Sequence, residues 1–130
     1  MGEYENTVKD IKKSFGFVPG FMKALPPYVL THDWPLMKKD TLGESKIPAK
    51  YRELMGLAVA ANIKCPYCQL FHKSVAQMLG ATPEEFAETA FLASYTSRWS
   101  AMIHAQHYDY DTFAKETVQI GEYLNKAPKK

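Results

Sequence analysis

Apolar residues recur along this chain at the three- and four-residue intervals of amphipathic helices, and no stretch alternates as a strand would. In residues 3–14, Val8 and Ile11 lead to Phe15 among charged neighbours, which predicts a first helix with Gly16 as its C-cap. Later helices are expected over about 21–25, 27–42, 48–61, 65–79, 82–97 with a further stretch to about 106, and 113–124. The pattern predicts an all-α fold of about six to seven helices.

Prolines and one capping box mark the expected helix boundaries. Pro48 suits the first turn of the helix over 48–61. The sequence Thr82-Pro-Glu-Glu85 combines a capping box with a proline at the first helical position, which indicates a helix start. Pro35 removes a backbone donor inside the stretch 27–42, so a kink or a fresh helix start is expected there.

The helix over 48–61 carries an acidic residue at the head of an apolar run. Residues 54–61 are apolar around nearly the whole circumference, as expected of a central, buried element. Glu53 shares a stripe with Gly56 and other small residues, which would let another helix approach closely. An inward-facing carboxylate must be paired, hydrogen-bonded or protonated. The alternative is a solvent-exposed glutamate near a helix start, favoured there by the helix dipole.

Length and charge narrow the class of protein. The 130 residues are expected to form one domain, large enough to bury a core without disulfides. Its 16 basic and 14 acidic residues are spread along the chain without a basic block, so neither nucleic acid nor a membrane is an expected partner. The apolar run over 54–63 is too short to span a bilayer, and the first six residues have no basic or apolar region, so no secretory signal is expected. We therefore expect a cytoplasmic protein.

The two cysteines of the chain stand close together at a predicted helix start. Cys65, Cys68 and His72 are spaced i, i+3 and i+7, so one helical face carries all three. Pro66 suits the first turn, which places Cys65 at or near the N-cap, where the helix dipole stabilises a thiolate. His72 follows Cys68 by one turn as a proton acceptor, and Glu53 could orient its imidazole. Such a group can be oxidised to a sulfenic acid and resolved as a disulfide.

The cysteine motif has three other interpretations. A thioredoxin-like protein needs strands, which the pattern does not predict. A zinc site could use Cys65, Cys68 and His72 with a fourth ligand, although structural zinc ions usually join two loops or strands. Two buried cysteines could also lie three residues apart by coincidence. The dithiol cycle requires no cofactor and no metal ion, and we expect none.

An aromatic group lies further along the chain. Phe91, Tyr95 and Trp99 are spaced for one helix face. They are expected to lie in the core or in an interface between subunits.

The motif resembles that of the alkylhydroperoxidase D (AhpD)-like proteins of the carboxymuconolactone decarboxylase superfamily. That family combines a Glu, a CxxC pair and a His four residues after the second Cys, here Glu53, Cys65, Cys68 and His72. The neighbouring sequences Ile47-Pro48 and Gly80-Ala-Thr-Pro-Glu-Glu are also similar to the family. The resemblance covers about residues 47–92, and residues 1–46 are similar to the N-terminal helical extension of some small members.

The resemblance implies an AhpD-like helical bundle and a thiol-dependent peroxidase that reduces hydroperoxides. In the family, the second cysteine reacts with peroxide and the first resolves, which would be Cys68 and Cys65, with His72 and Glu53 as a proton relay. The implied partners are an external dithiol reductant, such as a lipoyl or thioredoxin-type protein, and further copies in a trimer or hexamer. The alternatives are a redox-sensing or disulfide-exchange protein and a decarboxylase-type lyase.

The chain departs from the family at one position of the motif. The residue before the second cysteine is Tyr67, where the best-studied pattern has a histidine. A tyrosine donates a hydrogen bond but does not carry a proton at neutral pH as imidazole does. Tyr67 and Asn62 are accordingly expected only in supporting roles around the reactive residues.

Overall fold

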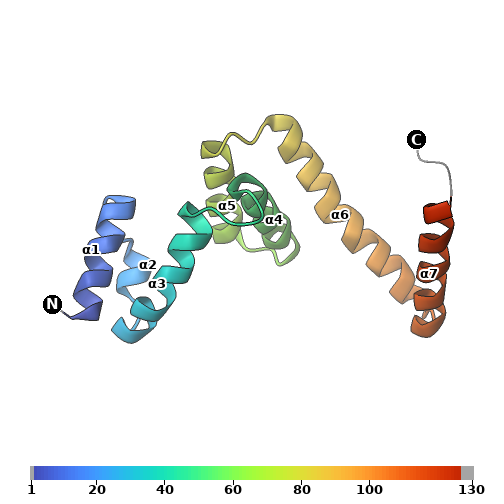
Figure 1. Cartoon of the computed structure of the whole chain (residues 1–130), viewed down its shortest axis with the longest axis horizontal. Helices are drawn as coiled ribbons and strands as arrows, with labels where there is room; N and C mark the ends of the chain where they lie inside the picture. Colours follow the sequence, from blue (N-terminus) through green and yellow to red (C-terminus); the bar gives the residue numbers. More distant parts are fainter. Residues whose placement is uncertain (1, 127–130) are drawn as a thin grey trace.

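The protein is built from helices alone. A computed structural model describes residues 2–126, which form seven helices and no strand (Figure 1). The predicted all-α fold and number of helices are therefore confirmed for this range. The helices are α1 Glu3–Phe15, α2 Gly20–Lys23, α3 Pro27–Leu42, α4 Ala49–Asn62, α5 Pro66–Met78, α6 Pro83–Ala105 and α7 Tyr110–Lys126.

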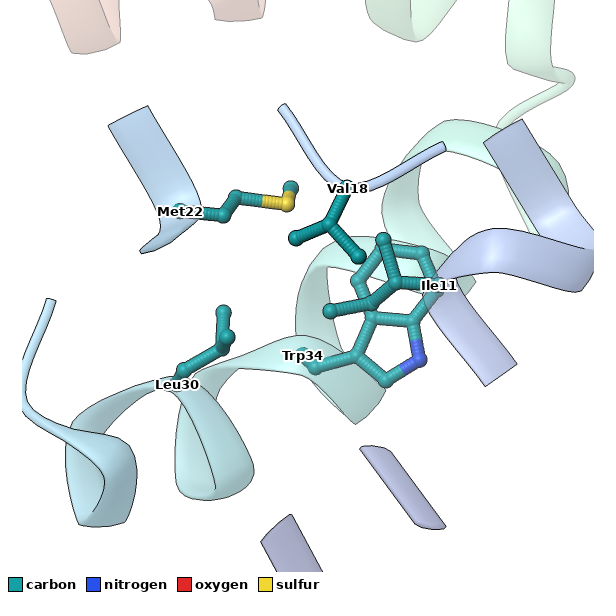
Figure 2. Packing of buried hydrophobic residues seen from close by; sticks show 5 residues of the cluster. All are labelled: Ile11, Val18, Met22, Leu30 and Trp34. Atoms are coloured by element: carbon teal, nitrogen blue, oxygen red, sulfur yellow. The ribbon is translucent and has the colours of Figure 1, made fainter. Parts of the chain in front are cut away.

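Helices α1 to α3 form a group with its own core at one end of the molecule (Figure 1). At its centre the Trp34 ring meets the Phe15 ring edge-on at 5.3 Å, and its indole N–H donates a 2.8 Å hydrogen bond to Asp10. This aromatic packing and its polar anchor hold α3 against α1. Five buried apolar side chains make the core: Ile11, Val18, Met22, Leu30 and Trp34 (Figure 2).

The boundaries of the first three helices follow local sequence signals, with one exception. Gly16 ends α1 in the left-handed region at φ 86°, and its N–H bonds to the Lys12 carbonyl, as predicted. At Pro35, by contrast, α3 continues without a fresh start. Leu30 and Trp34 before Pro35 and Met37 after it all pack in or against the core shared with α1, so tertiary packing offsets the loss of the backbone bond.

Helix α4 lies between α5 and α6 and packs against both. The predicted capping box begins α6, because Thr82 accepts from the Glu85 N–H and the Glu85 carboxylate accepts from the Thr82 N–H. The helix then runs unbroken from Pro83 to Ala105, so the expected stretches before and after Ser97 are one element.

The expectation that α4 is buried around its circumference is wrong. Glu53, Leu54 and Ala60 are buried, but Met55 is 54% exposed and Val59 60% exposed. Helix α4 packs against α5 and α6 and, less extensively, against α3, and this packing leaves Met55 and Val59 exposed.

The C-terminal part of the chain extends away from the other helices. In Figure 1, α6 slants away from α4 and α5, and α7 lies beyond its far end. No residue of α7 is buried, and α7 packs extensively against no other helix among residues 2–126. None of the described helices has the length and apolar character needed to cross a membrane.

Candidate redox site

The two cysteine sulfurs meet at the start of α5. Cys65 is the N-cap, and its sulfur accepts a hydrogen bond of 3.3 Å from the Cys68 N–H. One helical turn brings the sulfur of Cys68 to within 3.0 Å of the sulfur of Cys65. Both are free thiols and both are partly exposed. The pair is therefore reachable from solvent and close to the geometry of an intrahelical disulfide.

The hydrogen bonds within the pair make the two thiols unequal. When Cys65 is ionised, the Cys68 thiol can donate to its sulfur, which lowers the pKa of Cys65, and the Cys68 N–H lowers it further. The same side-chain hydrogen bond raises the pKa of Cys68, with a further upward contribution from partial burial. Cys65 is therefore the first of the two to become a thiolate.

A carboxylate–imidazole pair lies beside the dithiol. The carboxylate is on the facing helix α4, and the imidazole is one turn further along α5. Glu53 of α4 is 2% exposed and lies 2.7 Å from Nδ1 of His72, whose side chain is 25% exposed. The structure confirms the prediction that Glu53 faces inward and is paired. When the Glu53 carboxylate is ionised it can only accept a hydrogen bond, and Nδ1 of His72 is then the donor. This leaves Nε2 as the basic nitrogen of the imidazole.

The close approach of α4 and α5 depends on Gly56. A methyl group at this position would lie 2.7 Å from Nδ1 of His72 and 2.8 Å from Nε2. The glycine therefore makes room for the imidazole between the helices. The sequence signal for this contact was the stripe of small residues that follows Glu53.

Two residues outside the predicted set shape the turn that delivers the cysteines. Lys64 adopts a left-handed conformation at φ 59°, and the Cys65 N–H then bonds back to the Ala60 carbonyl at 3.1 Å. Gln69 donates to the same Ala60 carbonyl at 3.3 Å, which ties the first turn of α5 to the end of α4. A non-glycine residue in the left-handed region has no clear sequence signal, so the sequence did not indicate Lys64.

The structure brings together four predicted residues in two pairs. Cys65 and Cys68 form one pair, and Glu53 and His72 form the other. Among the described residues, no hydrogen bond joins His72 to either sulfur. The imidazole is oriented by Glu53 through one nitrogen and has its second nitrogen free for proton transfer.

The side chains of the two supporting candidates point to other roles. The Tyr67 side chain is 84% exposed, and it is the Tyr67 backbone N–H that contributes to the site, by lowering the pKa of Cys65. Asn62 links α4 to α6, since its amide donates to the Ala93 carbonyl at 3.3 Å and its oxygen accepts from Ser97. Within residues 2–126, no group of three His, Cys, Asp or Glu side chains is arranged to hold a metal ion.

Comparisons with known proteins agree on the family and the fold. The family described as carboxymuconolactone decarboxylase family matches residues 27–108, a range that contains all four residues of the two pairs. The crystal structure of the alkylhydroperoxidase AhpD core from Rhodospirillum rubrum ATCC 11170 is similar to this chain with a TM-score of 0.72. The two are 26% identical, and the match covers 86% of each chain. Among curated proteins, none matches the chain.

Proposed function

Because the chain belongs to the carboxymuconolactone decarboxylase family, we propose that it is a thiol-dependent peroxidase that reduces organic hydroperoxides through Cys65 and Cys68. The observation that carries this proposal is a pair of accessible sulfurs 3.0 Å apart at a helix start, beside an imidazole held by a buried carboxylate. The similar structure from Rhodospirillum rubrum is titled an alkylhydroperoxidase, which supports the same substrate class.

In the first step, Cys68 attacks the hydroperoxide. Nε2 of His72 takes the Cys68 proton, with Glu53 holding the imidazole in place. The thiolate attacks the terminal peroxide oxygen, so that an S–O bond forms and the O–O bond breaks. The alkoxide leaves as an alcohol with the proton from His72. The sulfur is oxidised by two electrons to a sulfenic acid, and the peroxide is reduced by two.

In the second step, Cys65 resolves the sulfenic acid. The Cys68 N–H, which donates to the sulfur of Cys65, favours a Cys65 thiolate next to the oxidised sulfur. The Cys65 thiolate attacks the sulfur of Cys68, the S–S bond forms, and the S–O bond breaks. Hydroxide leaves and takes up the proton that Cys65 released, which gives water.

The third step is reduction by an external dithiol, for which a lipoyl or thioredoxin-type donor is suited. One donor thiolate attacks the sulfur of Cys68 and displaces Cys65, because the thiol with the lower pKa leaves faster. The second donor thiol then attacks the mixed disulfide, releases Cys68 and leaves an oxidised donor. We place this cycle in the cytoplasm, where disulfides are kept reduced.

The test is peroxide consumption with cumene hydroperoxide and excess dithiothreitol. We compare the wild type, Cys68→Ser, Cys65→Ser and, as a control on the same helix, Ser74→Ala. Multiple turnovers in wild type and control, lost in both cysteine variants, are the expected result. Cys65→Ser should still form one equivalent of sulfenic acid, whereas Cys68→Ser should not.

Other results would assign the alternatives. One oxidation without turnover supports a redox sensor or disulfide-exchange protein, and a lyase activity that survives Cys68→Ser supports the decarboxylase alternative. Stoichiometric zinc in a protein that does not react with peroxide would contradict the redox cycle.

A further inference from the structure

A groove lies between α4, α5 and residues 86–93 of α6. Its volume is about 450 Å³, which falls in the range of roughly 300–1,000 Å³ found for small-molecule sites. Leu57 and Ala61 of α4 line one side, and Phe86 and Ala90 of α6 line another. Such sites combine a mainly apolar lining with a few polar groups that fix the ligand. The groove therefore has the size and the walls of a small-molecule site, and its polar groups decide which ligand it fits.

The charged groups at this groove are all cationic. Lys64 comes from the turn before α5 and Lys73 from α5 itself, and both are exposed. In the described part of the chain, neither ammonium forms an ion pair, and no acidic residue lines the groove. The ammonium of Lys73 lies 5.9 Å from the centre of the Phe86 ring, which holds it beside an apolar wall. A cleft lined by one sign of charge concentrates ions of the opposite sign, so this groove attracts anions.

The uncharged polar groups of the groove already have partners. The Thr89 hydroxyl donates to the Glu85 carbonyl at 2.8 Å, and the Gln69 amide donates to the Ala60 carbonyl at 3.3 Å. The two lysine ammonium groups are therefore the charged donors left for a ligand, and an ammonium can only donate. A carboxylate can only accept, so it is the complementary group.

The groove is a separate site from the dithiol. None of the four residues of the two pairs lines it. Lys73 follows Cys68 by five residues, which is about 140° around a helix of about 3.6 residues per turn. The groove and the sulfur of Cys68 therefore lie on different sides of α5, and a ligand in the groove leaves the thiols free to react.

We propose that this groove binds a monoanionic amphiphile, namely a medium-chain carboxylate. Its chain lies against the apolar walls, and its carboxylate pairs with the ammonium groups of Lys64 and Lys73. Exposed ion pairs contribute little each, so burial of the chain supplies most of the affinity and the lysines select the anion. The proposal concerns a second site and does not rest on the peroxidase chemistry.

The first test is equilibrium dialysis of radiolabelled decanoate, and of the neutral alcohol decanol, against the reduced wild-type protein. The groove variant is Lys64→Gln/Lys73→Gln. The control, Lys9→Gln/Lys12→Gln, removes the same charge from exposed positions of α1, away from the groove. We expect one decanoate per chain, bound more tightly than decanol. The groove variant should bind decanoate roughly tenfold more weakly, the scale of two exposed ion pairs, and the control should bind it as the wild type does.

Two further measurements test the same site with its lysines intact. Added salt should weaken binding of decanoate to the wild type but not binding of decanol, because salt screens the exposed charges. Ala90→Phe fills the groove and should abolish decanoate binding. Ala87→Phe is the matched control, since Ala87 is an exposed alanine of α6 outside the groove lining, and it should keep wild-type binding.

Four results would overturn the proposal. They are no saturable decanoate binding by the wild type, equal affinities for decanoate and decanol, equal losses in the two lysine variants, and equal losses in the two phenylalanine variants. Saturating decanoate should also leave the rate at which Cys65 and Cys68 react with a thiol reagent unchanged. Protection of these thiols would place the ligand at the dithiol and overturn the separate site. None of these measurements uses peroxide, so their failure is distinct from failure of the proposed function.

Discussion

At the scale of single residues, the main feature is the inequality of two thiols that share one helical turn. Cys65 receives hydrogen bonds from the Cys68 thiol and backbone, whereas Cys68 gains stability as a neutral donor. The resemblance assigns peroxide attack to Cys68, and the lowered pKa of Cys65 suits the resolving thiolate. The sequence predicted that Cys65 is the N-cap of its helix. The hydrogen bond between the two sulfurs could not be predicted, because it depends on where both side chains lie.

The inequality predicts a difference between two substitutions of Cys68. A serine hydroxyl can still donate to the sulfur of Cys65, whereas alanine cannot. The pKa of Cys65 should therefore be higher in Cys68→Ala than in Cys68→Ser, and its thiolate should form at higher pH. Ultraviolet absorbance of the thiolate as a function of pH measures both. Equal midpoints would show that the side-chain hydrogen bond does not control the pKa.

Glu53 is expected to matter through His72. Glu53→Gln keeps the size and an oxygen acceptor but removes the charge that fixes the imidazole tautomer and stabilises its protonated form. We expect a loss of roughly a hundredfold in peroxide turnover, the scale of one general-base contribution. Glu88→Gln, on the exposed part of α6, is the control and should keep wild-type turnover. Wild-type turnover in Glu53→Gln would remove Glu53 from the mechanism.

At the scale of elements, the function depends on how closely α4 and α5 approach. Gly56 and the buried Glu53 face His72 across this contact. The starts of α5 and α6 were predictable because each depends on neighbouring residues: Pro66 follows Cys65, and Pro83 lies within the capping box. The continuation of α3 through Pro35 was not, because it depends on packing against α1.

Gly56→Ala separates helix propensity from helix approach. Alanine should stabilise an isolated helix by about 1 kcal/mol relative to glycine. Here its methyl group would lie 2.7 Å from the His72 ring, so the ring must move from Glu53. A displacement of about 1 Å can lower a rate by roughly a hundredfold. We expect turnover to fall on that scale, while Gly20→Ala, where a methyl group meets nothing within 4 Å, keeps it. Unchanged turnover in Gly56→Ala would show that the ring position is not critical.

At the scale of the whole molecule, helices α1 to α3 form an N-terminal group, α4 and α5 form a central pair, and α6 and α7 extend away from that pair (Figure 1). Spacing alone predicted the aromatic face of α6 but left open whether it lies in the core or in an interface. Periodicity reports which residues share a face, and it cannot say which chain covers that face. The exposed side of α4 was misjudged for the same reason.

The central claim is that Cys65 and Cys68 are oxidised together by a hydroperoxide, and its most direct measurement is the stoichiometry of that reaction. Reduced protein is mixed with one equivalent of cumene hydroperoxide, and the alcohol, the free thiols and the intact mass are measured. We predict one alcohol per protein, loss of both thiols and a mass lower by two hydrogens, with both thiols and the original mass restored by dithiothreitol. Two free thiols remaining after the peroxide is consumed, or the same consumption in a Cys65→Ser/Cys68→Ser protein, would contradict the claim.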